Sequence, residues 1–331
     1  MSKRLDVLGI GNAIVDVLAR ADDRFLVDHG MVKGTMRLID AAEAERLYDA
    51  MGPAVEVSGG SAANTIAGLA ALNAKAGFIG IVRDDQLGKV FRHDITSLGV
   101  HFPTLSREHG EPTGRCLVLV TQDGQRTMNT YLGASQLLGP DDVDEAAVAR
   151  AEVLYLEGYL FDPPPAKEAF YKAARLAHEN GGKVALTLSD PFCVLRHREE
   201  FRVLVKDEVD ILFANEAEIM ALYKANSFEQ AREAVRPQVP IAALTRSEHG
   251  SVVIAGEETH VVPAEPVSYV ADTTGAGDLY AAGFLYGLGR DLPLSDCARF
   301  GNLAAGEIIS HIGARPETDL AHLARVRGLL G

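Results

Sequence analysis

Short runs of hydrophobic residues occur at intervals along the chain, most clearly in its second half. Runs of this length predict strands that are buried on both faces. They occupy residues 5–10, 154–156, 184–188, 211–214, 242–245 and 251–255. Helical patterns such as residues 165–180 lie between several of them, and Asn180-Gly181-Gly182 predicts a helix stop just before the next strand. Alternating strands and helices predict an α/β fold with a mostly parallel central sheet covered on both faces.

Other segments show a different pattern. Residues 35–39, 114–122 and 126–132 alternate polar and apolar positions, and Asp123-Gly124 between the last two is typical of a hairpin turn. Such alternation indicates a small sheet with one exposed face. We therefore expect a single domain over residues 1–331, with a lid formed by discontinuous segments at about 12–50 and 101–133.

Composition narrows the class of protein. The 331 residues are 47% hydrophobic, which is typical of a globular chain, and the net charge of −14 argues against a nucleic acid or an anionic membrane as partner. The three cysteines are far apart and form no C-x-x-C pair, so neither a disulfide framework nor a zinc knuckle is indicated. The first apolar run is too short for a signal segment or a membrane span, and we expect a cytoplasmic protein.

One segment combines glycines with a following small-residue helix. It reads Asp272-Thr273-Thr274-Gly275-Ala276-Gly277-Asp278. Backbone N–H groups that converge here, at the positive end of a helix, suit a phosphoryl group in transfer. Asp278 falls in the first helical turn, where a carboxylate can accept a hydroxyl proton. The alternative is a helix capped by a glycine turn, in which Asp278 only complements the helix dipole.

The pattern D-T-x-G-A-G-D resembles the C-terminal signature of the ribokinase-like, PfkB-type carbohydrate and nucleoside kinases. A second block, Ser58-Gly59-Gly60-Ser61-Ala62-Ala63-Asn64, is similar to the N-terminal G-G-x-x-x-N signature of that family. The resemblance implies a ribokinase-like three-layer α/β/α domain with a small β-sheet lid. It also implies ATP as the phosphoryl donor, Mg²⁺, and K⁺ as a further cation. Asp278 would be the catalytic base, assisted by Gly275, Ala276 and Gly277.

The same resemblance assigns the acceptor site. Asp16 is expected to accept hydrogen bonds from two ribose hydroxyls, and Asn64 offers both a donor and an acceptor. Gly59 and Gly60 permit close approach of a ring to the backbone. Read singly, Asp16 is also consistent with a solvated loop acid and Asn64 with a helix cap.

Further residues look like the adenosine kinase branch of the family. Asn12 precedes Asp16, and Arg126 stands where that branch has a lid arginine that neutralises phosphate charge. A surface salt bridge is the alternative for Arg126. Apolar walls for a base are expected from Met36, Leu38, Phe102, Leu132 and Phe161, although for each of them taken alone the core is a better explanation than ligand contact.

On the nucleotide side, Asn215-Glu216-Ala217-Glu218 looks like the N-x-x-E motif of the family, with Asn215 and Glu218 holding the waters of Mg²⁺. Residues 245–250 are similar to its T-x-G-x-x-G loop, although Ser247 replaces the middle glycine. The expected ATP-binding residues are Asn215, Thr245, Gly250, Thr274, Gly277 and Asn302. The resemblance also implies Asp272 as a ligand of the monovalent cation, and residues 313–316 resemble a segment near such a site.

Competing functions are less consistent with the sequence. A dinucleotide-binding dehydrogenase is disfavoured by Ile14 at the third fingerprint position, and a P-loop NTPase by Val90 after Gly88-Lys89. A non-catalytic ligand sensor would be expected to lose the base or the anion loop, and both are intact. The sequence thus predicts transfer of the ATP γ-phosphoryl group to the 5′-hydroxyl of adenosine, in purine salvage, by a monomer or homodimer. A ribokinase- or fructokinase-type sugar kinase and a broad-specificity nucleoside kinase remain alternatives.

Overall fold

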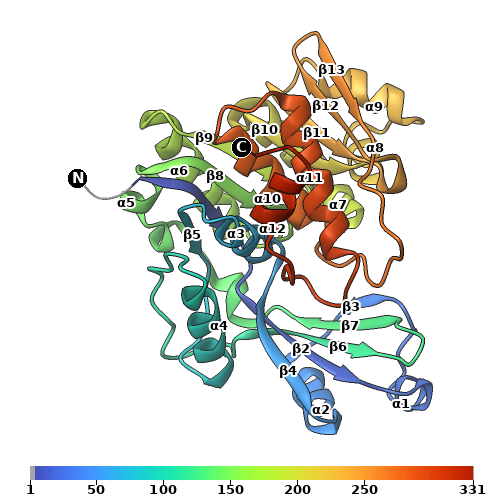
Figure 1. Ribbon diagram of the computed structural model, residues 1–331. Helices are drawn as coiled ribbons and strands as arrows, with labels where there is room; N and C mark the ends of the chain where they lie inside the picture. The colour runs from blue at the N-terminus through green and yellow to red at the C-terminus, as the bar shows by residue number, and fades with distance from the viewer. Residues whose placement is uncertain (1–3, 331) are drawn as a thin grey trace.

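The computed structural model describes residues 4–330 and is built around an eight-stranded sheet (Figure 1). The strand order is β13-β12-β11-β10-β9-β8-β1-β5. Strands β5, β1, β8, β9, β10 and β11 are parallel, and β12 and β13 extend one edge as antiparallel strands. Their bounds are β1 (Leu5–Ile10), β5 (Ala76–Ile79), β8 (Ala151–Glu157), β9 (Lys183–Thr187), β10 (Ile211–Asn215), β11 (Ile241–Thr245), β12 (Ser251–Ala255) and β13 (Glu258–Val262). The prediction of an α/β fold with a mostly parallel sheet is confirmed.

Helices cover both faces of this sheet because its strands are apolar at successive positions. Val7 and Val153 point into one hydrophobic cluster, and their neighbours Leu8 and Leu154 point into another. The first cluster is covered by α3 (Ser61–Ala71), α4 (Gln86–Ser97), α10 (Ala276–Leu288), α11 (Leu294–Ile308) and α12 (Leu320–Val326). The second is covered by α5 (Glu145–Val148), α6 (Pro164–Glu179), α7 (Pro191–Glu208), α8 (Glu216–Tyr223) and α9 (Phe228–Val235). The result is the three-layer arrangement of the ribokinase-like fold.

A second sheet of five strands forms the lid, in the order β3-β7-β6-β2-β4 (Figure 1). Its elements are β2 (Ile14–Arg20), α1 (Asp23–Asp28), β3 (Met36–Leu38), α2 (Ala41–Ala50), β4 (Ala54–Gly59), β6 (Gly114–Val120) and β7 (Arg126–Tyr131). Short 3₁₀ turns η1 (Gly133–Leu137), η2 (Pro140–Asp142), η3 (Gly158–Phe161) and η4 (Ser247–His249) lie in the connections. On one face of the lid, Val17 and Leu117 belong to the same buried cluster as Leu26 of α1 and Leu47 of α2.

The lid strands follow the predicted segments except at β4. Strands β2, β3, β6 and β7 lie within the two expected segments, whereas β4 begins at Ala54, beyond residue 50. Antiparallel pairing with β2, in which Val57 lies opposite Asp16, makes this segment part of the lid. The pairing of β4 with β2 is a tertiary contact, so the local sequence does not reveal it. The most prominent local feature is the glycine motif that follows.

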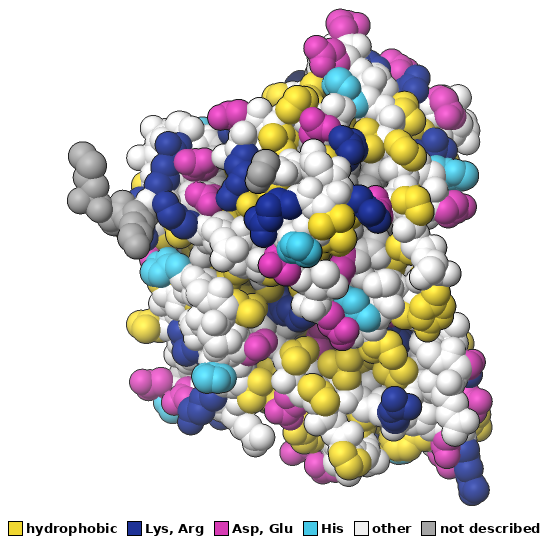
Figure 2. All heavy atoms as spheres, viewed as in Figure 1, with side chains coloured by type: hydrophobic (Ala, Val, Ile, Leu, Met, Phe, Trp, Pro, Cys, Tyr) yellow, Lys and Arg dark blue, Asp and Glu magenta, His cyan; other side chains and the backbone are white. Residues whose placement is uncertain are grey.

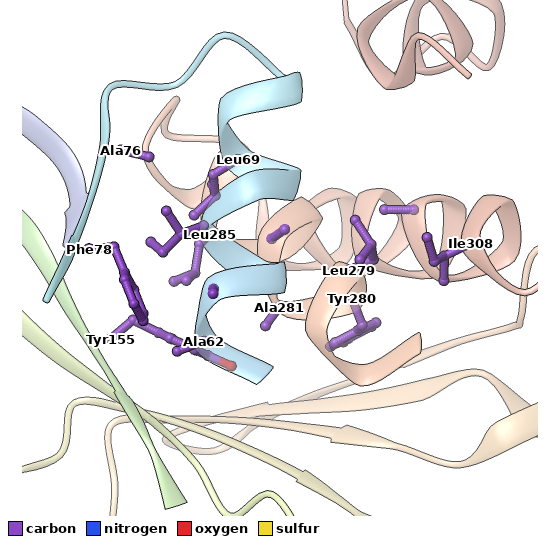
Figure 3. Close-up of a cluster of buried hydrophobic side chains, with 14 of the residues drawn as sticks. Ala62, Leu69, Ala76, Phe78, Tyr155, Leu279, Tyr280, Ala281, Leu285 and Ile308 are labelled. Atoms are coloured by element: carbon purple, nitrogen blue, oxygen red, sulfur yellow. The ribbon is translucent and has the colours of Figure 1, made fainter. Parts of the chain in front are cut away.

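Two helices rich in small residues carry much of the site. A Cβ added to Gly68 of α3 would come within 2.7 Å of Leu279 and 2.9 Å of Ala282 on α10, so the helices touch at this glycine. Side chains of both helices share one cluster with Phe78 and Tyr155 of the central sheet (Figure 3). This packing brings together the first turns of helices that are more than 200 residues apart in the sequence. Within residues 4–330, no helix combines the length and apolar character needed to cross a membrane.

Candidate active site

A cavity of about 1870 Å³ lies between the carboxyl ends of the parallel strands and the inner face of the lid. Open parallel sheets bind ligands at this edge. Strands β8, β9, β10 and β11 deliver Glu157, Thr187, Asn215 and Thr245 to the cavity wall. Because single-ligand pockets measure roughly 300–1,000 Å³, the cavity has room for two small molecules side by side.

Most residues predicted for the site line this one cavity. They are Asn12, Asp16, Met36, Leu38, Gly60, Asn64, Arg126, Leu132, Asn215, Glu218, Thr245, Gly250, Thr274, Gly275, Ala276, Gly277, Asp278 and Asn302. Gly59 lies beside them, and a Cβ at this position would overlap the carboxylate of Asp16. The fold therefore collects motifs from both halves of the chain.

Two residues predicted as base-pocket walls, Phe102 and Phe161, lie in the hydrophobic core instead. Phe102 packs against Phe91 with ring centroids 5.5 Å apart, and Phe161 stacks on Phe201 at 4.4 Å. Both are almost fully buried, and neither lines the cavity. Phe102 packs against β5 and α4, and Phe161 packs against α6 and α7. A linear pattern does not distinguish such core packing from ligand contact.

Asp278 sits in the first turn of α10 and is held by two side chains of α3. Ser61 Oγ donates to its Oδ1 at 2.6 Å, and Asn64 Nδ2 donates to its Oδ2 at 2.9 Å. Burial raises the pKa of Asp278 to about 6, against the two hydrogen bonds, which favour the ionised form. A carboxylate with such a pKa is ionised at neutral pH and basic enough to accept a hydroxyl proton.

The anion loop is formed by the residues just before Asp278. Gly275 has φ +78° and caps α10, a left-handed conformation that glycine adopts without strain. A Cβ added to Gly277 would meet no atom within 4 Å, so the backbone is open to the cavity here. The N-terminus of a 13-residue helix with an open backbone favours a negatively charged ligand.

Arg126 of β7 pairs with Asp272 across the boundary between lid and main domain. Its Nη1 lies 2.8 Å from Asp272 Oδ2, and both side chains are buried. Asp272 also accepts hydrogen bonds from Thr274 N, Thr274 Oγ1 and Gly313 N. The predicted role of Asp272 as a ligand of K⁺ does not fit this arrangement, because its carboxylate neutralises a guanidinium instead. Two nitrogens of Arg126, Nε and Nη2, have no hydrogen-bond partner among residues 4–330.

Asp16 projects from β2 of the lid into the polar end of the cavity. Burial raises the pKa of Asp16 to about 6, while Arg315 and Arg126 act in the opposite direction. Gly60, which has φ +100°, packs so closely on the backbone of Asn12 that a Cβ would overlap its carbonyl oxygen. The start of α3 and the start of the lid are thus held together around Asp16.

Two residues of the site were not predicted from sequence. Glu157, at the end of β8, accepts hydrogen bonds from Asn12 Nδ2 at 2.6 Å and from Ala62 N at 2.8 Å, and burial raises its pKa to about 7. A charged residue directly after a buried strand was the available signal, since parallel strands end at the same edge. Arg315, from the loop after α11, also lines the cavity; the resemblance of residues 313–316 to a family segment was the available signal, but it pointed to a cation site and not to this arginine.

Asn215 and Glu218 form a reciprocal cap at the start of α8. Glu218 N donates to Asn215 Oδ1 at 2.9 Å, and both carboxylate oxygens of Glu218 accept from Asn215. Each carboxylate oxygen retains a further lone pair, and Glu218 lines the cavity. The pair therefore fits the holding of Mg²⁺ through water. Within residues 4–330, no cluster of three or more His, Cys, Asp or Glu side chains is arranged to bind a metal directly.

The far end of the cavity contains the residues predicted to bind ATP. Gly250 has φ +79° after the η4 turn, in which Ser247 has φ +49°, so the backbone bends sharply despite the missing glycine at position 247. Asn302 Nδ2 donates to the carbonyl oxygens of Val262, at 3.3 Å, and Pro263, at 2.8 Å. Asn302 therefore holds residues 262 and 263 in place, and the next residues of the chain, 264–267, line the cavity.

Comparison with known proteins agrees with this geometry. The sequence pattern of the pfkB family carbohydrate kinases matches residues 35–320. The chain belongs to this family. Its members transfer a phosphoryl group to a hydroxyl of a sugar or nucleoside, and ATP is the donor that the family implies.

Solved structures of two bacterial kinases are similar over almost the whole chain. A probable sugar kinase from Rhizobium etli is 51% identical, covers 99% of this chain and 100% of its own, and has a TM-score of 0.93. The adenosine kinase from Sinorhizobium meliloti is 53% identical, with coverage of 98% and 99% and a TM-score of 0.91.

Curated relatives in the pfkB family have sugar substrates in their names. The ATP-dependent ribose-1-phosphate kinase of Halopiger xanaduensis is 31% identical over 78% of this chain and 82% of its own. The 5-dehydro-2-deoxygluconokinase of Shouchella clausii is 29% identical over 93% and 90%. The family is therefore established, and the acceptor has to be argued from the cavity.

Proposed function

We propose that this pfkB-family kinase transfers the γ-phosphoryl group of ATP to the 5′-hydroxyl of adenosine. The observation that carries the proposal is the composition of the acceptor end of the cavity. Asp16, Asn64 and Asp278 form a polar floor, and the other side chains that lid strands β2, β4 and β6 direct into the cavity are apolar. A nucleoside has the same division between a hydroxylated ribose and a flat base.

The apolar wall is one face of the lid sheet. Apolar residues at alternate positions of four lid strands line the cavity, namely Ile14, Leu18, Val55, Val57, Cys116, Val118 and Met128. The same face also carries the polar residues Asp16, Arg126 and Thr130. Leu38 and Met36 of β3 and Leu132 after β7 extend this wall. Hydrophobic side chains gather over the lid near its boundary with the main domain (Figure 2). A surface of this kind stabilises a heteroaromatic ring, whereas a free sugar has little apolar surface to bury against it.

The polar floor would orient the ribose. The ionised Asp16 is acceptor-only and matches a vicinal diol as a bidentate partner. Asn64 reaches into the same region from α3, beside Asp278. A ribose held between Asp16 and Asn64 would present its 5′-hydroxyl to Asp278, the remaining polar group of the floor.

In the proposed reaction, the acceptor hydroxyl donates a hydrogen bond to Asp278. Its oxygen attacks the γ-phosphorus, the bond from phosphorus to the β,γ-bridging oxygen breaks, and Asp278 takes the proton. Backbone N–H groups at Gly275, Ala276 and Gly277, together with the unpartnered Nε and Nη2 of Arg126, would donate hydrogen bonds to the transferring group. Mg²⁺ held through water by Asn215 and Glu218 would add positive charge beside the phosphates.

A sugar acceptor is the second candidate, and the curated relatives favour it. Both relatives described above act on sugars or sugar derivatives by name. Glu157 and Asn12 add polar groups at the floor that suit additional hydroxyls. The apolar lid face is the observation that supports our proposal of adenosine over a sugar.

The test is a substrate panel with coupled detection of ADP. Adenosine, inosine, guanosine, cytidine, ribose, fructose and ribose 1-phosphate would be compared by kcat/KM, with Asp278→Asn as the control for a contaminating kinase. Adenosine is expected to give the highest kcat/KM by at least about tenfold, which corresponds to about 1.4 kcal/mol of selectivity. A higher value for any sugar would refute the assignment of adenosine, and no acceptor-dependent ADP release from the folded protein would refute the proposed reaction.

A further inference from the structure

Arg315 occupies an unusual position for an arginine of a C-terminal loop. It follows α11, yet its guanidinium reaches the start of α3 and the end of lid strand β4. Nη1 donates to Asn64 Oδ1 at 2.9 Å and to Ala63 O at 3.2 Å, and Nη2 donates to Ser58 Oγ at 2.8 Å and to Ser58 O. The Nε atom is buried and has no hydrogen-bond partner among residues 4–330. The side chain thus joins three segments around the acceptor end of the cavity.

The contact with Asn64 determines which way its amide faces. A guanidinium can only donate hydrogen bonds, so the atom of Asn64 that faces Arg315 must be the oxygen. The amide nitrogen then faces Asp278 and donates to its Oδ2 at 2.9 Å. With the amide reversed, its oxygen would face the carboxylate and repel it. Arg315 therefore fixes the hydrogen bond that holds Asp278.

The positive charge of Arg315 also favours the ionised form of Asp278. Several groups that add negative charge or burial face Asp278, namely Asp16 of the lid, Glu157 and Tyr155 of β8, Tyr159 of η3 and Glu218 of α8. The other arginine near the floor, Arg126, is already paired with Asp272. Burial is the main cause of the raised pKa of Asp278, and Arg315 opposes it. Burial also lowers the pKa of Arg315 itself, although the neighbouring carboxylates counteract this.

We propose that Arg315 is a positioning residue for phosphoryl transfer, which acts on Asp278 through the amide of Asn64. It touches neither reacting atom, and its effect is on the orientation and the ionisation of the proton acceptor. The proposal rests on the proposed role of Asp278 as that acceptor, and it holds for a nucleoside and for a sugar alike.

The experiment compares Arg315→Gln, Arg315→Lys and a control, Arg92→Gln, in the full-length protein. Arg92 also donates its hydrogen bonds mainly to backbone carbonyls, those of Phe102 and Thr104, but it does not line the cavity. For each protein, kcat and KM would be measured across about pH 5.5 to 9, with the acceptor that gives wild type its highest kcat/KM. Thermal unfolding and calorimetric binding of that acceptor would be measured in parallel.

Arg315→Gln is expected to lower kcat at neutral pH by about 10- to 100-fold, with the KM and the binding of the acceptor changed less than about threefold. The acid limb of kcat should move to higher pH, so that part of the activity returns in alkaline buffer. Arg315→Lys keeps the positive charge. Its kcat should lie between those of Arg315→Gln and wild type, and its acid limb should lie close to that of wild type. Arg92→Gln should lower thermal stability only.

Three results would overturn the proposal. The first is a kcat for Arg315→Gln within about twofold of wild type. The second is a rise in acceptor KM with kcat unchanged, which would make Arg315 a binding residue. The third is a loss that is equal in all three variants and independent of pH, which would indicate general structural damage.

If Arg315→Gln does not fold, Arg315→Lys alone must show a reduced kcat at unchanged KM, and wild-type kcat in that variant refutes the proposal. A wild-type protein inactive on the whole panel would instead refute the proposed function, and that measurement comes first.

Discussion

Replacement of Asp278 by asparagine separates catalysis from stability, because the carboxylate has opposite effects on the two. The side chain is enclosed at the floor of the cavity, and its pKa is raised by burial to about 6. A carboxyl group with a pKa above its unfolded value binds protons more tightly in the folded state. It therefore destabilises the fold as pH rises from the unfolded pKa to the folded pKa, and the full penalty applies above both.

The magnitude follows from that shift. An increase from about 4 to about 6 corresponds to about 3 kcal/mol of destabilisation at pH 7, and to about 1.5 kcal/mol at pH 5, where the folded-state carboxyl is largely protonated. These figures are upper bounds, since water in the cavity weakens the penalty. Asparagine has the same shape but retains only one of the two hydrogen bonds from Ser61 and Asn64, which costs about 1 kcal/mol. We expect Asp278→Asn to be about 2 kcal/mol more stable than wild type at pH 7, with the difference falling to about 0.5 kcal/mol near pH 5.

Catalysis should respond in the opposite sense. Loss of a general base lowers kcat by about 10²- to 10⁴-fold, which is about 3 to 5 kcal/mol in the barrier, while the acceptor KM changes little. The assays are ADP release for kcat and chemical denaturation at pH 5 and pH 7 for the free energy of unfolding. The matched control is Asp85→Asn, because the Asp85 carboxylate accepts hydrogen bonds from Gly88 and Thr113 away from the cavity. That variant should lose stability at unchanged kcat.

The role of Asp278 as a general base would be refuted by an Asp278→Asn protein that keeps kcat within about tenfold of wild type. It would equally be refuted by a loss of kcat that is matched by a loss of stability at pH 7, because the carboxylate would then have a structural role. A stability difference that does not shrink on acidification would show that Asp278 does not titrate in this range.

Two further predictions concern the acceptor and the metal. Asp16→Ala is expected to raise the nucleoside KM by about 10- to 100-fold through loss of hydrogen bonds to a charged group, and kcat should change much less. A 2′,3′-dideoxynucleoside should bind wild type and Asp16→Ala equally poorly, and an unaltered KM for the ribonucleoside would remove Asp16 from the site. Glu218→Gln is expected to raise the Mg²⁺ concentration for half-maximal activity by about tenfold, because the substitution removes a carboxylate beside the water molecules that would bind the metal. The control is Ser227→Ala, which removes the hydroxyl that accepts a hydrogen bond from Gln230 N and so caps α9. If both variants showed the same Mg²⁺ dependence, Glu218 would have a capping role alone.

Six of the eight strands of the central sheet, all but β5 and β13, and the location of the anion loop could be predicted from the sequence. Short apolar runs such as 211–214, which alternate with helical patterns, favour buried strands, and the run of small residues around Gly275 indicates a helix start next to a carboxylate. Both are local properties, since they depend on periodicity and backbone geometry within a few residues. Residues that follow a buried strand, such as Asn215, were likewise predictable, because all parallel strands end at one edge.

The tertiary structure alone decided which of these residues meet. Asn64 contacts Asp278 only because Gly68 allows α3 to pack closely on α10, and Arg315 reaches Asn64 across 251 positions of the chain. The same is true of Arg126, which the lid places against Asp272 rather than leaving it on an exposed hairpin. A hydrophobic pattern specifies the face of an element on which a side chain lies, but not what that face will contact. Contacts between distant segments arise from the packing of whole elements, and the orientation of the Asp278 carboxylate depends on them.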